Sequence, residues 1–168
     1  MESKEERRVI PVKNYFILSI ICFVTIVATI YINAWIKTYK VNSNVNPLIG
    51  KVQEITLSDL EATMSETNLA ILYVANNDNF ALDKEILKRV NADSINDYFY
   101  YMNVNAISQE DCIKSLKEYF SDVKNEINSV PMFIYIKDGQ AVKVIDSKDK
   151  KLNINDFNVI LDNYLEID

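Results

Sequence analysis

The sharpest hydrophobic pattern in the chain is a long uncharged run that follows a short polar tail. Residues 1–13 carry four Lys or Arg, and Tyr15–Ile36 then contains no charged residue. A helix over this run rises about 33 Å at 1.5 Å per residue, which spans the roughly 30 Å hydrocarbon core of a bilayer. The pattern predicts a polar tail over residues 1–13 and a transmembrane helix over residues 14–37.

A cleaved signal peptide is the alternative for this run, and we favour an uncleaved anchor. The apolar stretch is longer than a signal-peptide core of about 7–15 residues, and no obvious small-x-small cleavage site follows it. Aromatic residues lie at both ends, where amphipathic rings favour the headgroup level. Cys22 lies inside the run and is expected to act as an apolar filler.

The flanking charges predict the orientation of the helix. The tail has four basic residues, whereas only Lys37 and Lys40 follow the run closely. The positive-inside rule therefore predicts a single-pass cell-membrane protein with a cytoplasmic N-terminus and an extracytoplasmic C-terminal domain. The turn-rich sequence Val41–Gly50 follows, and residues 38–50 are expected to form a linker.

From residue 51 onward, strand-like and helix-like patterns alternate. Ser58 and Glu61 have capping-box spacing, and Ser108 precedes two acidic residues, so both serines are expected to begin helices. The tight-turn pair Asp138-Gly139 separates the last two apolar runs, as in a β-hairpin. The expected strands are 51–56, 69–75, 98–106, 131–136 and 140–145, and the expected helices are 58–64, 80–90, 108–127 and 155–165.

This order of elements predicts one mixed sheet between helices. Strands that alternate with helices pair in parallel through right-handed crossovers, and the hairpin adds an antiparallel edge. The nearly continuous apolar run Leu69–Ala75 is typical of a central strand that is covered on both faces. About 120 residues are enough for one domain with one core.

Composition excludes several classes of function. The chain has no histidine, two glycines and two cysteines, Cys22 and Cys112, so it offers no histidine base, phosphate loop, zinc spacing or disulfide framework. Residues 1–40 have a net charge of +3 and the remainder −9, which disfavours nucleic-acid binding. Heavy use of Asn, Ile, Lys and Tyr hints at an AT-rich, bacterial genome.

The segment Ser129–Gln140 resembles the corresponding segment of the thioredoxin superfamily, and the resemblance extends over Lys51–Asp168. Val130-Pro131 stands where that family has a Val-Pro step with a cis-proline, and Lys137-Asp138-Gly139 stands at its hairpin turn. The resemblance implies a thioredoxin-like three-layer α/β/α sandwich with a mixed central sheet, preceded here by the transmembrane helix.

The resemblance also implies that the redox chemistry of the family is absent. Its Cys-x-x-Cys motif matches positions within Asn76–Leu82, which contain no cysteine. Dithiol exchange needs an attacking thiolate and a resolving thiol. We therefore expect no catalytic residue, no cofactor and no metal.

The expected role is a non-catalytic module that binds a protein or an extended peptide at the extracytoplasmic face. By resemblance, a groove beside the cis-proline takes a peptide through strand-like hydrogen bonds. Its expected lining is Asn76, Asn77, Asp78, Asn79, Phe80, Val130 and Pro131.

Three other hypotheses remain open. The first is a single-cysteine thiol-disulfide oxidoreductase that uses Cys112, although Glu110 and Asp111 beside it oppose thiolate formation. The second is a structural subunit of an envelope complex. The third is a Ca²⁺ site formed by the asparagine cluster 76–79 together with Asp83, because both supply oxygen ligands.

Overall fold

The computed structural model describes residues 11–43 and 45–164. The chain divides into two compact units, residues 1–44 and 45–168. Residues 1–10 of the expected tail, and Leu165 of the expected last helix, lie outside the described residues.

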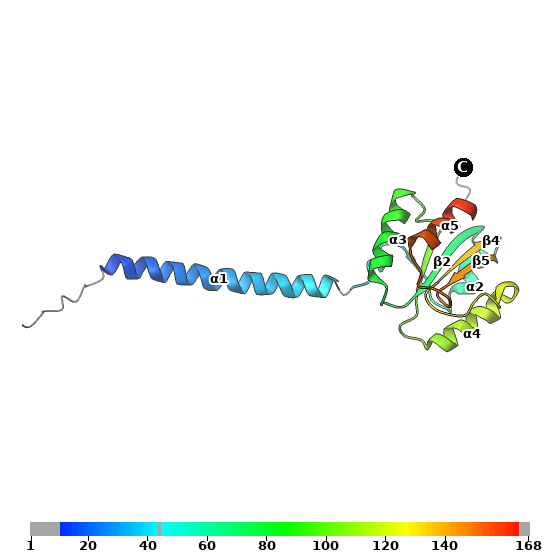
Figure 1. The fold of residues 1–168 in the computed structure, drawn as a ribbon, viewed down its shortest axis with the longest axis horizontal. Coiled ribbons are helices and arrows are strands. Elements are labelled where there is room, and N and C mark those ends of the chain that lie inside the picture. The colour runs from blue at the N-terminus through cyan, green and yellow to red at the C-terminus, as the bar shows by residue number, and fades with distance from the viewer. Residues whose placement is uncertain (1–10, 44, 165–168) are drawn as a thin grey trace, which may run out of the picture. The chain divides into compact units, whose positions relative to one another are not determined.

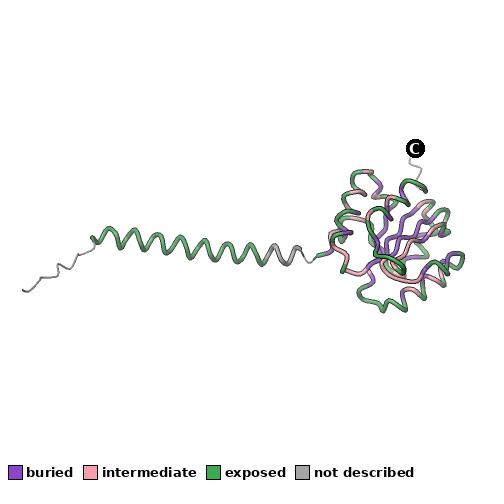
Figure 2. Tube along the Cα trace, viewed as in Figure 1, coloured by how far each residue is buried: buried purple, intermediate pink, exposed green. Residues whose placement is uncertain are grey.

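The first unit contains one helix, α1 (Val12–Ser43). Its segment Val12–Lys37 has a mean hydropathy of 2.5 and is long and apolar enough to cross a membrane. The side chains described along it are exposed (Figure 2). The hydroxyls of Thr25 and Thr29 donate to backbone carbonyls four residues earlier, at 2.8 Å, so the helix itself satisfies both donors.

The second unit is built on a five-stranded mixed sheet (Figure 1). The strand order is β1-β3-β2-β4-β5; β1 and β2 both pair with β3 in parallel, and β4 is antiparallel to β2 and to β5. This arrangement confirms the predicted mixed sheet. The strands are β1 (Gln53–Glu54), β2 (Leu69–Ala75), β3 (Phe99–Asn103), β4 (Met132–Lys137) and β5 (Gln140–Asp146).

Helices cover both faces of this sheet. One face packs on α2 (Leu60–Ser65) and α4 (Gln109–Tyr119), and the other packs on α3 (Phe80–Ala92) and α5 (Ile154–Tyr164). Successive side chains of a strand point to opposite faces. Along the central strand β2, Ala70, Leu72 and Val74 accordingly join the first apolar cluster, and Ile71, Tyr73 and Ala75 join the second.

The β4–β5 turn has the conformation that its sequence predicts. Asp138 and Gly139 both have positive φ, 51° and 75°, as a tight primed turn requires. The Asp138 N–H donates to the Asn68 carbonyl at 2.8 Å. The pairing of β4 with β5 shifts register between Tyr135 and Ile136.

The start of α4 agrees with the sequence prediction, and the start of α2 differs from it. Ser108 caps α4, and its hydroxyl accepts a hydrogen bond from the Asp111 N–H at 3.1 Å. The expected cap at Ser58 is wrong, because α2 begins one residue later, after Asp59. The Ser58 hydroxyl instead lies 2.7 Å from that of Thr56, so it is engaged away from the helix.

Helix α4 also ends earlier than its pattern predicts. Phe120 leaves the helical conformation, with φ −95° and ψ 64°, and its ring turns into the core. A short 3₁₀ turn, Ser121–Val123, follows. Burial of Phe120 therefore competes with continuation of the helix toward residue 127.

The structure differs from the expected linker over residues 38–50. Helix α1 continues through Ser43, and residues 45–50 belong to the second unit. Leu48 is fully buried in the cluster beneath α3 and α5, and Asn46 is buried beside it. A segment with a linker-like composition is thus part of the domain core.

Candidate functional site

The loop Asn76–Asn79, between β2 and α3, is bonded to the end of β3 by asparagine side chains. The Asn77 N–H donates to Asn105 Oδ1 at 3.1 Å, and Asn103 Nδ2 donates to Asn77 Oδ1 at 3.3 Å. The Asn105 N–H in turn donates to Asn103 Oδ1 at 3.0 Å. Within the loop, Asn76 Nδ2 donates to Asp78 Oδ2 at 2.9 Å. These bonds hold the loop in place without a disulfide.

Sequence reasoning did not single out Asn103 and Asn105. Both lie at the carboxyl end of β3, and β2 ends directly beside it because the two strands are parallel. Asn103 pairs with Ala75, the residue before the loop. The Asn-x-Asn pattern at the end of the neighbouring parallel strand was the signal that could have identified them.

A small cleft lies at this edge of the sheet. Its volume is about 170 Å³, and its lining residues are Asn76, Val104, Asn105, Ile107, Gln109 and Val130. The structure therefore brings Asn76 and Val130, two of the expected groove residues, to one cleft. The peptide bond between Val130 and Pro131 is cis, and Pro131 directly precedes β4.

The other expected groove residues lie elsewhere. Asp78 and Asn79 line a separate cavity of about 300 Å³ between the start of α3 and the loop before α5. Asn77 is held by the asparagine bonds described above. Phe80, the first residue of α3, is partly exposed and, like Pro131, lines neither cavity.

The cleft has a neutral lining. Three of its side chains are carboxamides, which both donate and accept hydrogen bonds, and three are aliphatic. None of the six can act as a nucleophile or as a general acid or base. The arrangement can hold a polar backbone and contact an apolar side chain.

Asp83, which the sequence offered as a possible calcium ligand, points into the core. Its carboxylate accepts hydrogen bonds from Asn46 Nδ2 at 2.8 Å and from the Tyr73 hydroxyl at 2.9 Å. Burial raises the pKa of Asp83 to about 6. Among the described residues, no group of three or more His, Cys, Asp or Glu is placed to hold a metal ion.

Cys112 is fully buried in the apolar cluster beneath α2 and α4. Burial raises the pKa of its thiol to about 11, because the charged thiolate loses its hydration. The thiolate is the reactive form of cysteine, so this environment opposes nucleophilic chemistry.

We expect Cys112 to react with a maleimide about a hundredfold more slowly in the folded chain than in the urea-unfolded chain, because both access and thiolate formation are suppressed. The measurement uses the detergent-solubilised chain carrying Cys22→Ser, so that one thiol remains. Equal rates in the folded and unfolded chains would restore the single-cysteine enzyme as a candidate.

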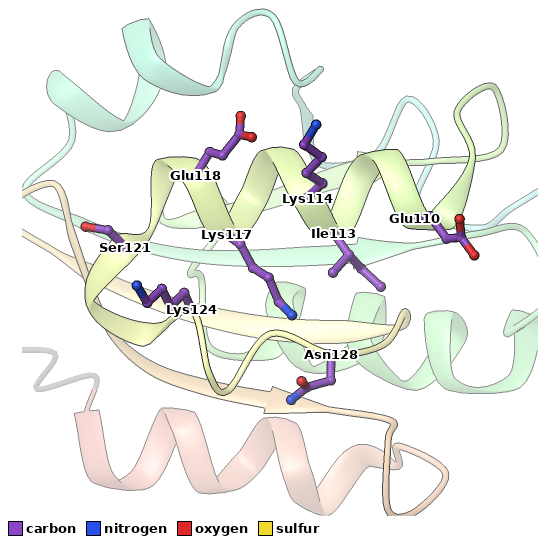
Figure 3. Close-up of a pocket in the computed structure, with 8 residues that line it drawn as sticks. All are labelled: Glu110, Ile113, Lys114, Lys117, Glu118, Ser121, Lys124 and Asn128. Carbon is purple, nitrogen blue, oxygen red and sulfur yellow. The ribbon is translucent and has the colours of Figure 1, made fainter.

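An open depression of about 660 Å³ follows the outer side of α4 and the turn after it. Figure 3 shows Ile113 on α4 between Lys117 and Glu110, with the lysine and glutamate side chains pointing in several directions. Its charged lining residues are Glu110, Lys114, Lys117, Glu118 and Lys124. The mixed signs give this surface no clear preference for a cationic or an anionic ligand.

No protein-family model and no curated protein sequence matches the chain. Several solved thioredoxins are similar in structure. Thioredoxin f2 of Chlamydomonas reinhardtii is 11% identical, with a TM-score of 0.49, over 70% of this chain and 99% of that protein. Plasmodium falciparum thioredoxin is 16% identical, with a TM-score of 0.44, over 67% of this chain and 99% of its own.

The architecture of the second unit identifies its fold. Its five strands form a mixed sheet, as the resemblance implied, in the order β1-β3-β2-β4-β5. Helices α3 and α5 pack on one face, α2 and α4 pack on the other, and the β4–β5 hairpin follows the Val130–Pro131 step. The protein therefore has a thioredoxin-like fold, preceded by a helix long and apolar enough to cross a membrane.

Proposed function

We propose that this chain is a membrane-anchored, redox-inactive thioredoxin-like protein whose domain binds an extended segment of another protein. The supporting observation is the neutral cleft between Asn76 and Val130, at the edge where thioredoxins carry their cysteines. The polar side chains that line this cleft are the carboxamides of Asn76, Asn105 and Gln109, and none is a thiol. This chemistry suits recognition of a peptide and offers no group for dithiol exchange.

The dimensions of the cleft favour one inserted side chain. A volume of about 170 Å³ accommodates a single aliphatic residue of medium size. Val104, Ile107 and Val130 supply the apolar contact, and Asn76, Asn105 and Gln109 supply donors and acceptors for the flanking peptide groups. A charged side chain would lose hydration there without gaining a partner of opposite charge.

In this proposal the domain lies outside the membrane on a single-pass anchor, and residues 14–37 cross the bilayer. The apolar length of α1 supports the anchor, and the four basic residues of the tail support a cytoplasmic N-terminus. Protease digestion of the domain in intact cells tests the orientation, and protection until lysis would contradict it.

Site-specific photocrosslinking in intact cells tests the binding role. A benzoylphenylalanine at Ile107, which lines the cleft, is expected to form adducts with a small set of proteins. The same probe at Val142, an exposed position on β5, serves as the control. Identical adducts from both positions would contradict the cleft and favour a structural subunit held by other surfaces.

A charge substitution sharpens this test. Gln109→Glu keeps the side-chain shape and lies in the first turn of α4, where the helix dipole favours an acid, so the fold is retained. Unpaired charge in the cleft is expected to reduce the Ile107 adducts about tenfold. Gln140→Glu, an exposed residue at the start of β5, is the matched control and should leave them unchanged.

A further inference from the structure

The second unit buries a carboxylate that has no cation beside it. Apart from tyrosines and Cys112, three polar or charged side chains are buried among the described residues: Asn46, Asp83 and Asp156. Asp156 forms a salt bridge with Lys150 at 2.5 Å. Asp83 has no ion pair within the described part of the chain. A buried charge without a partner is unfavourable, and such a group tends to bind a proton.

The partners of Asp83 come from three separate parts of the domain. Tyr73 lies on β2, Tyr101 lies on β3, and Asn46 lies in the segment that follows α1. One carboxylate oxygen accepts from the Tyr73 hydroxyl, and the other accepts from Asn46 Nδ2, which also lies 3.0 Å from the Tyr101 hydroxyl. The Leu48 N–H donates to Asn46 Oδ1 at 2.8 Å and fixes the orientation of that amide.

The groups around this cluster do not neutralise Asp83. Burial raises the pKa of both tyrosines, so both stay uncharged near neutral pH. The nearby carboxylate of Glu54 on β1 adds negative charge beside Tyr101. Helix α5 packs apolar residues against this side of the sheet. Its buried acid, Asp156, forms a salt bridge with Lys150, so α5 offers no cation to Asp83.

We propose that Asp83 is a proton-binding site, and that its protonation stabilises the folded domain when the surroundings change from neutral to mildly acidic. The proton comes from solvent and resides on the carboxylate. Since Tyr73 has a hydroxyl that can donate or accept, it can bond to either form of the acid.

The sign of the effect follows from the environment of Asp83. Burial raises its pKa from the ordinary 3.8 to about 6, so the folded domain binds the proton more tightly than the unfolded chain does. The stabilisation is complete at low pH and is lost as the pH rises through about 6. Between pH 5 and pH 7 the unfolding equilibrium constant should rise about tenfold from this group alone.

The position of Asp83 connects this effect to the candidate site. Asp83 lies in the first turn of α3, and its N–H donates to the carbonyl of Asn79, the last residue of the asparagine loop. Protonation of Asp83 therefore removes a buried charge from the turn of α3 that directly follows the loop. This proton-linked stabilisation does not depend on what the cleft binds.

Carbon-13 NMR of the full chain in detergent micelles provides the direct test. Asp83→Asn identifies the carboxyl resonance of Asp83 by its disappearance. We expect that resonance to titrate with a midpoint near pH 6. A midpoint at or below pH 4 would overturn the proposal.

Urea unfolding of the same micelle-bound chain at pH 5 and pH 7, followed by the near-ultraviolet circular dichroism of the buried tyrosines, provides the second test. The tenfold difference between the two pH values should disappear in Asp83→Asn. It should persist in Asp156→Asn, which removes a buried aspartate that is paired with Lys150. Persistence of the full difference in Asp83→Asn would contradict the assignment. If Asp83→Asn fails to fold, the Asp83 carboxyl resonance is assigned in the unmodified chain from its through-bond correlations to the backbone, and its titration midpoint still decides the proposal.

Discussion

Replacing Phe133 with alanine is expected to lower the free energy of unfolding by about 3–5 kcal/mol. Phe133 is fully buried on β4. Its ring stacks on Tyr73 with centroids 4.8 Å apart and lies 5.4 Å from the ring of Phe157 on α5. Alanine removes both ring contacts and leaves a cavity that the surrounding strands and helix cannot fill. Denaturant unfolding of the full chain in micelles measures the loss.

A smaller substitution and a surface control make this test specific. Phe133→Leu keeps most of the apolar volume, so its loss should be about half as large or less. Val142→Ala, on the neighbouring strand and 48% exposed, should change stability by less than about 0.5 kcal/mol. Similar losses for Phe133→Ala and Val142→Ala would show that the aromatic cluster does not form the centre of this core.

Replacing Leu48 with alanine is expected to lower the free energy of unfolding by about 2–4 kcal/mol. Leu48 belongs to a segment whose composition predicts a linker, yet its side chain is fully buried among residues from β2, α3 and α5. The loss combines removal of apolar area from the core with the cavity left beneath α3. The same unfolding measurement applies.

The neighbouring residue provides the control for Leu48. Ile49 has a side chain of similar size but is 36% exposed, so Ile49→Ala should cost less than about 1 kcal/mol. Equal and small losses at the two positions would mean that residues 45–50 behave as a linker in solution. A large loss at Leu48 alone would place the start of the domain before residue 48.

Most of the fold could be predicted because its central elements have distinctive local sequence patterns. The apolar runs of β2 and β4 and the Asp138-Gly139 turn specify buried strands and a hairpin locally, without knowledge of their partners. The alternation of strands and helices then restricts the topology to very few arrangements.

The remaining features depend on contacts between distant residues, which local patterns do not encode. Asn46 is buried because it bonds to Asp83, and Leu48 is buried because it packs in the apolar cluster beneath α3 and α5. The turn-rich sequence of this segment does not indicate either contact. The expected groove likewise divided into two cavities. Asn105 follows β3 and Gln109 begins α4, and only the folded sheet brings them into one cleft with Asn76.

Strand β5 leaves the sheet with one long free edge, which bears on how the protein avoids aggregation. Only β4 pairs with this seven-residue strand among the described residues, so its outer backbone groups could template pairing with another chain. Two features discourage such pairing. The register shift at Tyr135 and Ile136 interrupts a flat ladder, and Lys143, bridged to Glu126 at 3.3 Å, places a charge midway along the strand. A high local concentration of domains would therefore favour separate molecules over edge-to-edge chains.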